Sequence, residues 1–464
     1  MQNNYKEFLQ QKRFVLDSVG FEIDKSKLNN ILFDFQKDIV RWSIAKGRAA
    51  IFADCGLGKT FCQLEWANQI LNEVGGKILI LAPLNVVHQT VEEGVKLGVP
   101  VNACESQNDI VDGINITNYD KLDKFDTSVF CGVVLDESSI LKSFTGKTRN
   151  SIIDKFEKTK YKLACTATPA PNDYMELGNH SEFLGVMTRN EMLSMFFTHD
   201  GGQTSKWRLK GHSENLFWEW MSSWAVFIDN PSNLGYDTNK YDLPELHIKE
   251  IVVDGDEPTN EQMTLVERRE ARKESLEARC AEAANIIKNS DEKFVVWCDL
   301  NLEQSTLSKY IENAVSIQGS TPQNKRVSME NDWKNGDVQS LITKPLCYGY
   351  GSNWQHCHNI IFTGLSDSYE KYYQALRRCW RFGQNEEVNV YIVISAKEGC
   401  VKDNINRKDN EFKIMKKNML DYTKEITKNE LKKTNRIASN YDPDVKICFP
   451  TWEEFNIECT KPVY

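Results

Sequence analysis

Short hydrophobic runs recur along the chain and are separated by segments of helix length. The first series comprises KILILA from Lys77, INITN from Ile114, CGVVLDE from Cys131 and YKLACT from Tyr161. The second series comprises KFVVWC from Lys293, AVSIQG from Ala314, VQSLIT from Val338, NIIFTG from Asn359 and VNVYIVI from Val388. Continuous apolar strands that alternate with amphipathic segments are typical of a parallel sheet with helices on both faces. The pattern predicts an α/β protein with two such sheets.

A different pattern separates the two series, from about residue 188 to residue 243. Strand-type runs disappear there, and aromatic residues take on helical spacing, with Trp218, Trp220 and Trp224 in NLFWEWMSSWAVFI. This spacing favours the core of a helical insert, although a base-stacking surface is an open alternative. The charged segment from Gln262 to Asn289 has no Gly or Pro, and it predicts one long exposed helix.

Composition and charge narrow the class of protein. A chain of 464 residues is too long for one ordinary core, and 41% hydrophobic content excludes a disordered or collagen-like chain. No apolar stretch is long enough for a membrane span or a signal peptide, so we expect a soluble cytoplasmic protein without a membrane partner. The thirteen cysteines are typical of free thiols in a reducing compartment. Zinc binding by His356, Cys357 and His358 is disfavoured, because the side chains of adjacent residues point in different directions.

The C-terminal part differs from the rest in charge. Between Lys397 and Tyr441 the chain has twelve Lys or Arg and seven Asp or Glu, whereas its overall net charge is −9. Such a basic tail is either a solvated helix or an element that faces nucleic acid, and the sequence leaves both open.

The strongest chemical signal is ADCGLGKT, from Ala53 to Thr60, between the apolar run AAIF and a helical segment. A strand, a glycine loop and a helix form the setting of a phosphate-binding loop, in which Gly56 and Gly58 let backbone amides turn toward phosphates. Lys59 would supply a cation to the β- and γ-phosphates, and Thr60 a hydroxyl to Mg²⁺. Ala53 departs from the general pattern, which has Gly there.

Two further groups complete a nucleotide site. Asp136 and Glu137 end an apolar strand, where a phosphate-loop protein needs a residue that organises Mg²⁺ and a base that activates water. In QALRRCWRFGQ, the spacing of Gln374, Arg378 and Arg381 places all three on one helical face. If that helix faces the phosphate loop from a second domain, it can clamp a γ-phosphate.

The motifs together resemble the superfamily 2 helicases, most closely the Swi/Snf-like double-stranded DNA translocases, from about Phe33 to Ile394. LFDFQKD resembles the adenine-reading segment, with Gln36 as its glutamine, and DESS from Asp136 resembles the DExx box. LAPLNVVHQ and ITNYD resemble nucleic-acid contacts of the first lobe, and TATP from Thr166 the third motif. QALRRCWRFGQ is similar to the Swi/Snf pattern Q-A-x-x-R-x-x-R-x-G-Q at every fixed position.

The resemblance implies two RecA-like lobes with ATP and Mg²⁺ between them. We expect lobe 1 at residues 1–187, a helical insert at 188–243, lobe 2 with the arginine fingers at 244–396, and a basic helical extension at 397–464. Asp136 would hold Mg²⁺ through water, Glu137 would activate water, and Gln374, Arg378 and Arg381 would act on the γ-phosphate. DNA, duplex or forked, is the expected partner, with RNA as an alternative and no protein partner identified.

Two departures from the family affect this reading. Ser139 stands where the family has His or Gln in its box, and the glycine-rich fifth motif, around Gly349 and Gly351, has an unusual register. The insert is also shorter than in eukaryotic remodelers of the family, and the resemblance to compact family members implies a phage or mobile-element protein. An alternative from another class is an ATP switch that recruits a nuclease or replication partner; retention of both Glu137 and the arginines disfavours it.

Overall fold

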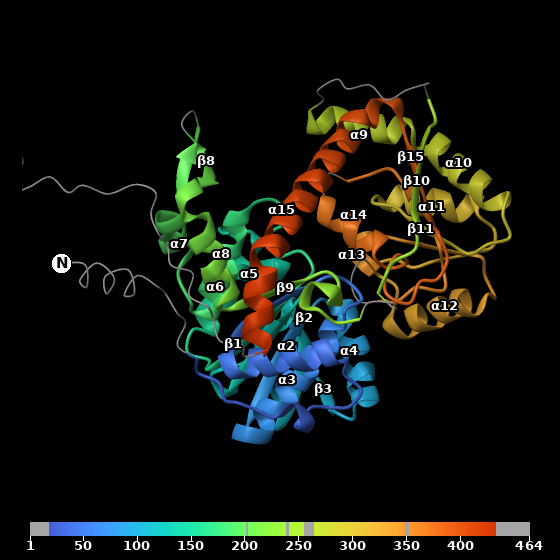
Figure 1. The fold of residues 1–464 in the computed structure, drawn as a ribbon. Coiled ribbons are helices and arrows are strands. Elements are labelled where there is room, and N and C mark those ends of the chain that lie inside the picture. Colours follow the sequence, from blue (N-terminus) through green and yellow to red (C-terminus); the bar gives the residue numbers. More distant parts are fainter. Residues whose placement is uncertain are drawn as a thin grey trace, which may run out of the picture.

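The computed structural model describes residues 18–200, 203–237, 241–254, 264–348, 352–366 and 368–432. Two parallel sheets form separate lobes, coloured blue to teal and yellow to orange in Figure 1. The sheet of lobe 1 has seven strands, in the order β3 (Val101–Ala103), β4 (Gly113–Asn118), β2 (Lys77–Ala82), β5 (Gly132–Asp136), β6 (Tyr161–Cys165), β1 (Arg48–Ala53) and β9 (Ala225–Ile228).

The sheet of lobe 2 has six strands, and every neighbouring pair is parallel. Their order is β10 (Leu246–Val252), β15 (Val388–Ile394), β14 (Asn359–Thr363), β11 (Phe294–Trp297), β13 (Ser340–Thr343) and β12 (Ala314–Ser316). The two parallel sheets confirm the α/β fold of two RecA-like lobes.

Helices cover both faces of the first sheet because its buried side chains alternate. Ile78 and Ile80 of β2 belong to the cluster that includes residues of α2 and α3, whereas Leu79 and Leu81 belong to the cluster on the opposite face. The helices of lobe 1 and the following segment are α2 (Asp34–Lys46), α3 (Lys59–Val74), α4 (Leu84–Leu97), α5 (Lys147–Lys155), α6 (Leu177–Leu184), α7 (Arg189–Phe196) and α8 (Glu214–Ser222). Those that follow are α9 (Leu265–Glu274), α10 (Leu276–Lys288), α11 (Asn301–Tyr310), α12 (Gln323–Asn335), α13 (Pro345–Tyr348), α14 (Tyr369–Leu376) and α15 (Gly399–Lys432).

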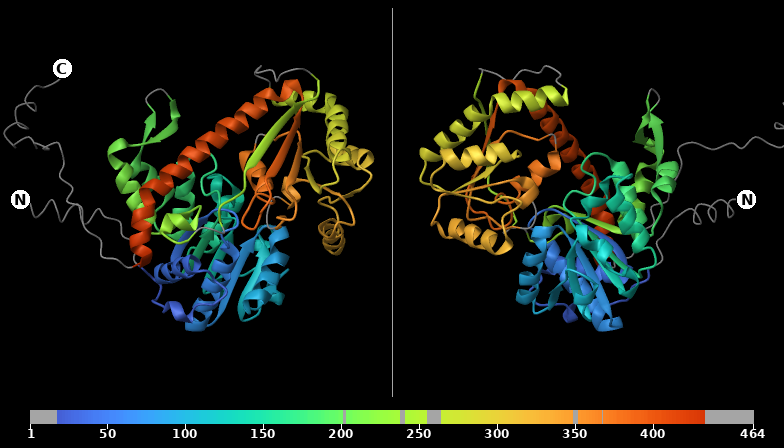
Figure 2. Two further views of the ribbon diagram at one scale, coloured as in Figure 1. Left: turned by 45° about the vertical axis from the view of Figure 1, so that its right-hand side comes forward. Right: turned by 180° about the vertical axis from the view of Figure 1, so that it is seen from behind.

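The segment between the lobes is only partly helical, which corrects the prediction that strands disappear there. It contains an antiparallel hairpin of β7 (Phe197–Asp200) and β8 (Gln203–Leu209), which projects from the molecule in Figure 2, and β9, which pairs with β1. Trp218, Trp220 and Trp224 are each at most 4% exposed. The core reading of these tryptophans is therefore confirmed.

The predicted long helix after residue 262 is wrong in two respects, within the part described from Thr264. Two helices, α9 and α10, meet at Ser275, whose side chain bonds back to Ala271 O at 2.9 Å. One side of α10 is buried, and there Arg279 donates to Glu303 Oε1 at 2.9 Å. The charged composition suggested exposure because buried charges are rare unless paired, and here they are paired.

The C-terminal helix α15 crosses from lobe 2 to lobe 1, as the red ribbon shows from two sides in Figures 1 and 2. Tyr369 Oη of lobe 2 donates to Asp409 Oδ1 at 2.7 Å, and Arg41 Nη2 of lobe 1 donates to Leu431 O at 3.1 Å. Between these ends, Trp218 stacks on Tyr422 with ring centroids 5.8 Å apart. The helix therefore packs on both lobes.

Candidate active site between the lobes

The phosphate-loop residues lie between β1 and α3, and two of them need glycine. Gly56 and Gly58 have φ angles of 89° and 76°, which side chains rarely adopt. A Cβ on Gly56 would lie 2.9 Å from Phe382 Cβ, and a Cβ on Gly58 would lie 2.2 Å from Gln36 Nε2. Lys59 Nζ donates to Ala53 O at 3.0 Å, inside the loop.

The acidic pair lies at the end of β5, beside the loop. Asp136 Oδ1 accepts a hydrogen bond of 2.6 Å from Gln63 Nε2, and Glu137 Oε2 accepts one of 3.3 Å from Thr166 Oγ1. Glu137 has a φ of 51°, a left-handed conformation that is rare for a residue with a side chain and typical of functional sites. Burial is the main factor that raises the pKa of Glu137, to about 7, which suits a general base near neutral pH.

The predicted helical face of Gln374, Arg378 and Arg381 needs correction. Helix α14 ends at Leu376, and the N–H groups of Arg378 and Cys379 bond to carbonyls three residues earlier, at 3.2 and 3.3 Å. Both arginines therefore lie in the tightened turn after the helix. They still converge, because Arg378 Nη1 and Arg381 Nη1 both donate to Ser352 O, at 3.1 and 3.4 Å.

This turn carries donors suited to an anion. Within the described part of the chain, buried Gln374 Nε2 and Arg381 Nε have no hydrogen-bond acceptor. Burial and the charge of Arg378 lower the pKa of Arg381 to about 10. A phosphate between these donors would satisfy both and would offset the repulsion between the arginines.

The second lobe reaches the phosphate loop directly. Arg377 Nη2 donates to Cys55 O at 3.1 Å, Tyr373 Oη donates to Asp54 Oδ1 at 2.7 Å, and Cys55 Sγ lies 3.7 Å from Gln374 Oε1. Residues more than 300 positions apart in the sequence therefore share one site.

Gln36 and three aromatic rings form one wall of this region. Gln36 Nε2 donates to Leu57 O at 2.9 Å, which ties the predicted adenine-reading glutamine to the loop. The Tyr241 ring stacks on Phe382 of lobe 2 with centroids 4.6 Å apart, and Phe33 contacts Tyr241 edge-on at 5.9 Å. A cavity of about 470 Å³ lies beside them and is lined by residues that include Asp54, Leu57, Tyr241, Phe382 and Lys416.

The unusual Ser139 takes part in another contact between the lobes. Its Oγ donates to Glu370 Oε1 of α14 at 2.7 Å, and Lys142 forms an ion pair with the same carboxylate. Asn85, in the predicted nucleic-acid segment of lobe 1, accepts from Arg326 Nη1 of lobe 2 at 3.0 Å. Gly349 and Gly351 of the fifth motif lie outside the described residues.

Several residues of the site were missed by sequence reasoning. Asp54 lies two residues before Gly56, Glu370 four before Gln374 and Arg377 directly before Arg378, but such positions carry no signal of contact with the other lobe. Glu93 of α4 lies near the Thr60 side chain, although VEEG looks like an ordinary exposed helix segment. Lys416 lies in the basic tail, for which the sequence left open a solvated helix and an element that faces nucleic acid; it pairs with Asp54 and Asp229.

The donors near Asp136 fit a Mg²⁺ ion. Asp136 is 5% exposed, and burial raises its pKa because it disfavours the charged carboxylate. A bound cation would stabilise that charge. Buried Gln63 Oε1 beside Asp136 has no hydrogen-bond donor among the described residues. Carboxylate, amide and hydroxyl oxygens, the last from Thr60, are the ligands that Mg²⁺ prefers.

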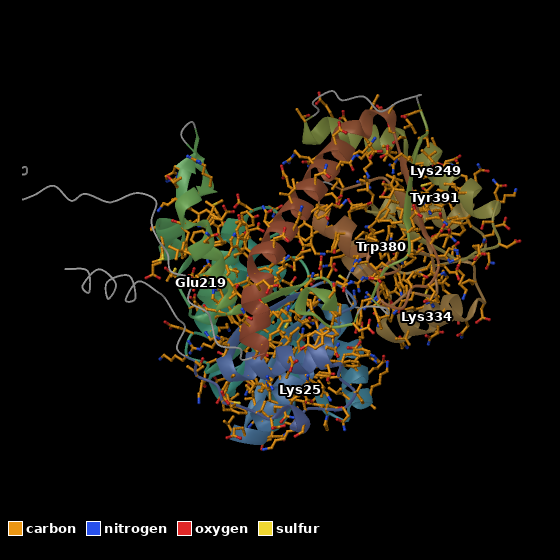
Figure 3. All side chains as sticks on the ribbon, viewed as in Figure 1. Lys25, Glu219, Lys249, Lys334, Trp380 and Tyr391 are labelled. Atoms are coloured by element: carbon orange, nitrogen blue, oxygen red, sulfur yellow. The ribbon has the colours of Figure 1, made fainter. Side chains whose placement is uncertain are left out.

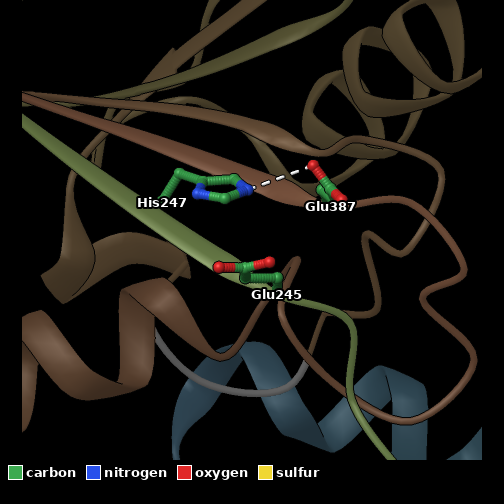
Figure 4. A group of neighbouring side chains, drawn as sticks. All are labelled: Glu245, His247 and Glu387. Atoms are coloured by element: carbon green, nitrogen blue, oxygen red, sulfur yellow. Dashed lines mark hydrogen bonds and ion pairs between the residues drawn. The ribbon is translucent and has the colours of Figure 1, made fainter.

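One other group has metal-ligating chemistry within the described ranges. Glu245, His247 and Glu387 lie exposed at the start of β10 and β15, with ligand atoms within 4.8 Å of one another (Figure 4). His247 Nε2 is 3.1 Å from Glu387 Oε2, an exposed contact of a kind that is common without a metal. Trp380, labelled in Figure 3, donates to Pro244 O at 2.9 Å and holds the same segment on lobe 2.

In the part of the chain that the structure describes, no helix is both long and apolar enough to cross a membrane.

Comparisons with known proteins find similarity to helicases. Residues 278–383 match the family described as helicase conserved C-terminal domain. The chain is 24% identical over 421 residues to the DNA annealing helicase and endonuclease ZRANB3 of Mus musculus, covering 80% of this chain but 39% of that protein. It is 22% identical to the uncharacterized ATP-dependent helicase YqhH of Bacillus subtilis (strain 168), covering 74% of this chain and 72% of that one.

The fold resembles that of one solved structure. S. cerevisiae Dbp5 bound to RNA and ADP BeF3 superposes with a TM-score of 0.52 at 12% identity, covering 83% of this chain and 93% of that one. The chain spans less than half of the length of the ZRANB3 relatives.

Proposed function

Because the chain belongs to the superfamily 2 helicases, we propose that it is a DNA-dependent ATPase that hydrolyses ATP between its lobes and moves along DNA. The observation that carries this proposal is the direct contact between Tyr373–Arg377 of lobe 2 and Asp54–Cys55 of the phosphate loop. It supports a site completed only when both lobes meet, as an ATP-driven motor requires.

In this proposal the loop residues bind the nucleotide. Backbone amides around Gly56 and Gly58 hold the phosphates, Lys59 leaves the Ala53 carbonyl to meet them, and Gln36 reads the adenine. Asp136 and Thr60 would hold Mg²⁺, which when bound neutralises phosphate charge. The buried, polar surroundings make each of these contacts stronger than in water.

The remaining residues act on the reacting groups. Glu137 orients a water molecule and takes its proton, because burial leaves its carboxylate basic enough at neutral pH. Arg378 and Arg381, with Gln374, meet the charge that develops on the γ-phosphate. Closure and opening of the lobes would then shift two sets of backbone contacts along a strand, without reading its sequence.

DNA is the proposed partner. The ZRANB3 relatives are named as DNA annealing helicases, and QALRRCWRFGQ has the spacing of the Swi/Snf-like DNA translocases. The likeness to Dbp5 supports the fold alone, so RNA is an outcome of the test. We propose a cytoplasmic protein, in a bacterial host if it is encoded by a phage.

The test is ATPase activity with single-stranded DNA, duplex DNA, forked DNA and RNA at one salt concentration. We expect duplex or forked DNA to raise turnover most, and Lys59→Ala to abolish it because the loop loses its mobile cation. Greater stimulation by RNA would overturn the DNA assignment, and full turnover by Lys59→Ala would overturn the site. Turnover that no nucleic acid changes would favour the assembly-switch alternative.

A further inference from the structure

The side chain of Asp54 is bound by groups from three separate parts of the chain. Its Oδ1 accepts hydrogen bonds from Cys55 N and from Tyr373 Oη of α14, each at 2.7 Å. Its Oδ2 lies 3.3 Å from Arg377 Nη2, beyond the end of α14, and 2.7 Å from Lys416 Nζ of α15. The phosphate loop, lobe 2 and the C-terminal helix therefore meet at one carboxylate.

The charges at this point are paired and largely removed from water. The Asp54 side chain is 8% exposed and that of Lys416 is 29% exposed. Burial alone would raise the pKa of Asp54, but the cations of Arg377 and Lys416 hold it well below its ordinary value. Lys416 Nζ also lies 3.4 Å from Asp229 Oδ2, just after β9, so two acids face two bases. Loss of one partner would leave a poorly compensated charge.

Asp54 also contacts Lys59, the lysine that binds phosphate in the proposed mechanism. Lys59 Nζ donates to the carbonyls of Ala53 and Asp54, at 3.0 and 3.4 Å. Lys416 thus holds the side chain of Asp54 while Lys59 holds its backbone. The course of the loop before Gly56 depends on both contacts.

The rest of α15 is anchored well enough to transmit this constraint. Phe412, Met415 and Met419 are each at most 8% exposed and belong to a hydrophobic cluster that includes residues of both lobes. They lie three or four residues apart, on the side of the helix that carries Lys416 toward the loop. Lys417, the next residue, is exposed.

We propose that Lys416 is a positioning residue of the ATPase site, which acts through Asp54 to hold the start of the phosphate loop and makes the C-terminal helix part of the nucleotide machinery. This inference rests on the proposed ATPase function. It gives Lys416 a role that differs from both open interpretations of the tail, a solvated helix and an element that faces nucleic acid.

The test measures kcat and KM for ATP with the full chain and saturating duplex DNA. Lys416→Met should lower kcat/KM by about tenfold, within the range for charged residues in contact. Most of the loss should be in KM, since the loop holds phosphates in both the ground and transition states. Lys416→Arg, which keeps the charge, should recover most of it. Lys417→Met is the matched control and should behave like the wild type.

A double-mutant cycle separates positioning from general stability. Asp54→Asn combined with Lys416→Met should lose no more than the larger single change, because both remove the same contact. If Lys416→Met does not fold, Asp54→Asn is compared with the double variant, which leaves no lone charge on this pair: equal kcat/KM supports action through Asp54, whereas a further loss in the double variant overturns it.

The inference is overturned if the KM of Lys416→Met for ATP equals that of Lys417→Met. It is also overturned if the effects of Asp54→Asn and Lys416→Met on kcat/KM simply add. Lys59→Ala distinguishes this failure from failure of the proposed function. An inactive Lys59→Ala beside a normal Lys416→Met rejects only the role of Lys416, whereas an active Lys59→Ala rejects the ATPase site itself.

Discussion

The proposed role of Glu137 as general base predicts that the ATPase reaction depends on pH near neutrality. Burial raises the pKa of Glu137 to about 7; Lys59 and Arg378 oppose the increase, while Asp136 and Glu370 add to it. A general base works only when deprotonated, so activity should fall as pH decreases through this value. The relevant parameter is kcat/KM, because it reports ionisation of the free enzyme.

The size of the effect follows from that pKa. At pH 6, one unit below the value, roughly one tenth of the molecules carry the deprotonated base, and at pH 8 about nine tenths do. We therefore expect kcat/KM to rise about tenfold between pH 6 and pH 8. With the ordinary carboxyl pKa of 4.5, the change over the same interval would be less than about 5%.

The assay compares kcat/KM of the wild type and of Glu370→Gln from about pH 5.5 to about pH 8.5, a range that lies on both sides of the pKa of Glu137. The single amide oxygen can keep the hydrogen bond from Ser139, whereas Lys142 loses its ion pair, and the substitution removes a negative charge near Glu137. The acidic limb should therefore move to lower pH. Ionisation of ATP itself is common to both proteins and cancels in the comparison.

A flat profile between pH 6 and pH 8 would refute the assignment of Glu137 as the base. An acidic limb that Glu370→Gln leaves in place would show that another group titrates.

Three further predictions concern single residues. Glu137→Gln should keep ATP bound but stop hydrolysis, because the amide has the same shape and takes no proton; fluorescent-nucleotide binding beside turnover measures both. Glu303→Ala should destabilise the protein by about 3–5 kcal/mol in urea unfolding, since Arg272 and Arg279 lose their buried partner. Burial would raise the pKa of Glu303, but both arginines hold it below its ordinary value. The stabilisation by the ionised carboxylate is therefore present above the ordinary pKa and should disappear as pH falls through the folded-state pKa. A Glu303→Ala variant as stable as the wild type would refute this. Trp220→Ala should lower the melting temperature and leave DNA affinity of the folded protein unchanged, because the ring is 4% exposed; a stable variant with weak DNA binding would contradict it.

Most of the two sheets could be predicted from local sequence. The runs KILILA, CGVVLD and VNVYIVI are strands β2, β5 and β15. Strand β9 was missed because its four residues, Ala225–Ile228, follow an aromatic helical pattern, and a short apolar run has no period that separates strand from helix. Its place became definite only through pairing with β1.

Part of the candidate site could be predicted from local sequence, and part depends on contacts between distant residues. Lys59, Asp136 and Glu137 stand in local motifs whose spacing indicates their chemistry. The contact of Asp54 with Lys416 joins residues 362 positions apart, and no periodic pattern reports such a pair. The helical face of Gln374, Arg378 and Arg381 was wrong because α14 tightens into a turn before Gly383, which has a φ of 87°.

A catalytic site shared by the two lobes is tested most directly by Arg381→Ala. In the proposed mechanism Arg381 meets charge that develops only in the transition state, so its loss should reduce kcat far more than ATP affinity, by about 10³–10⁵, the effect known for arginine fingers. Turnover per folded molecule, nucleotide affinity and melting temperature should be measured on one preparation. A large fall in kcat with nearly unchanged affinity and melting temperature is the predicted result. A normal rate per folded molecule, with only a lower melting temperature, would contradict the shared site.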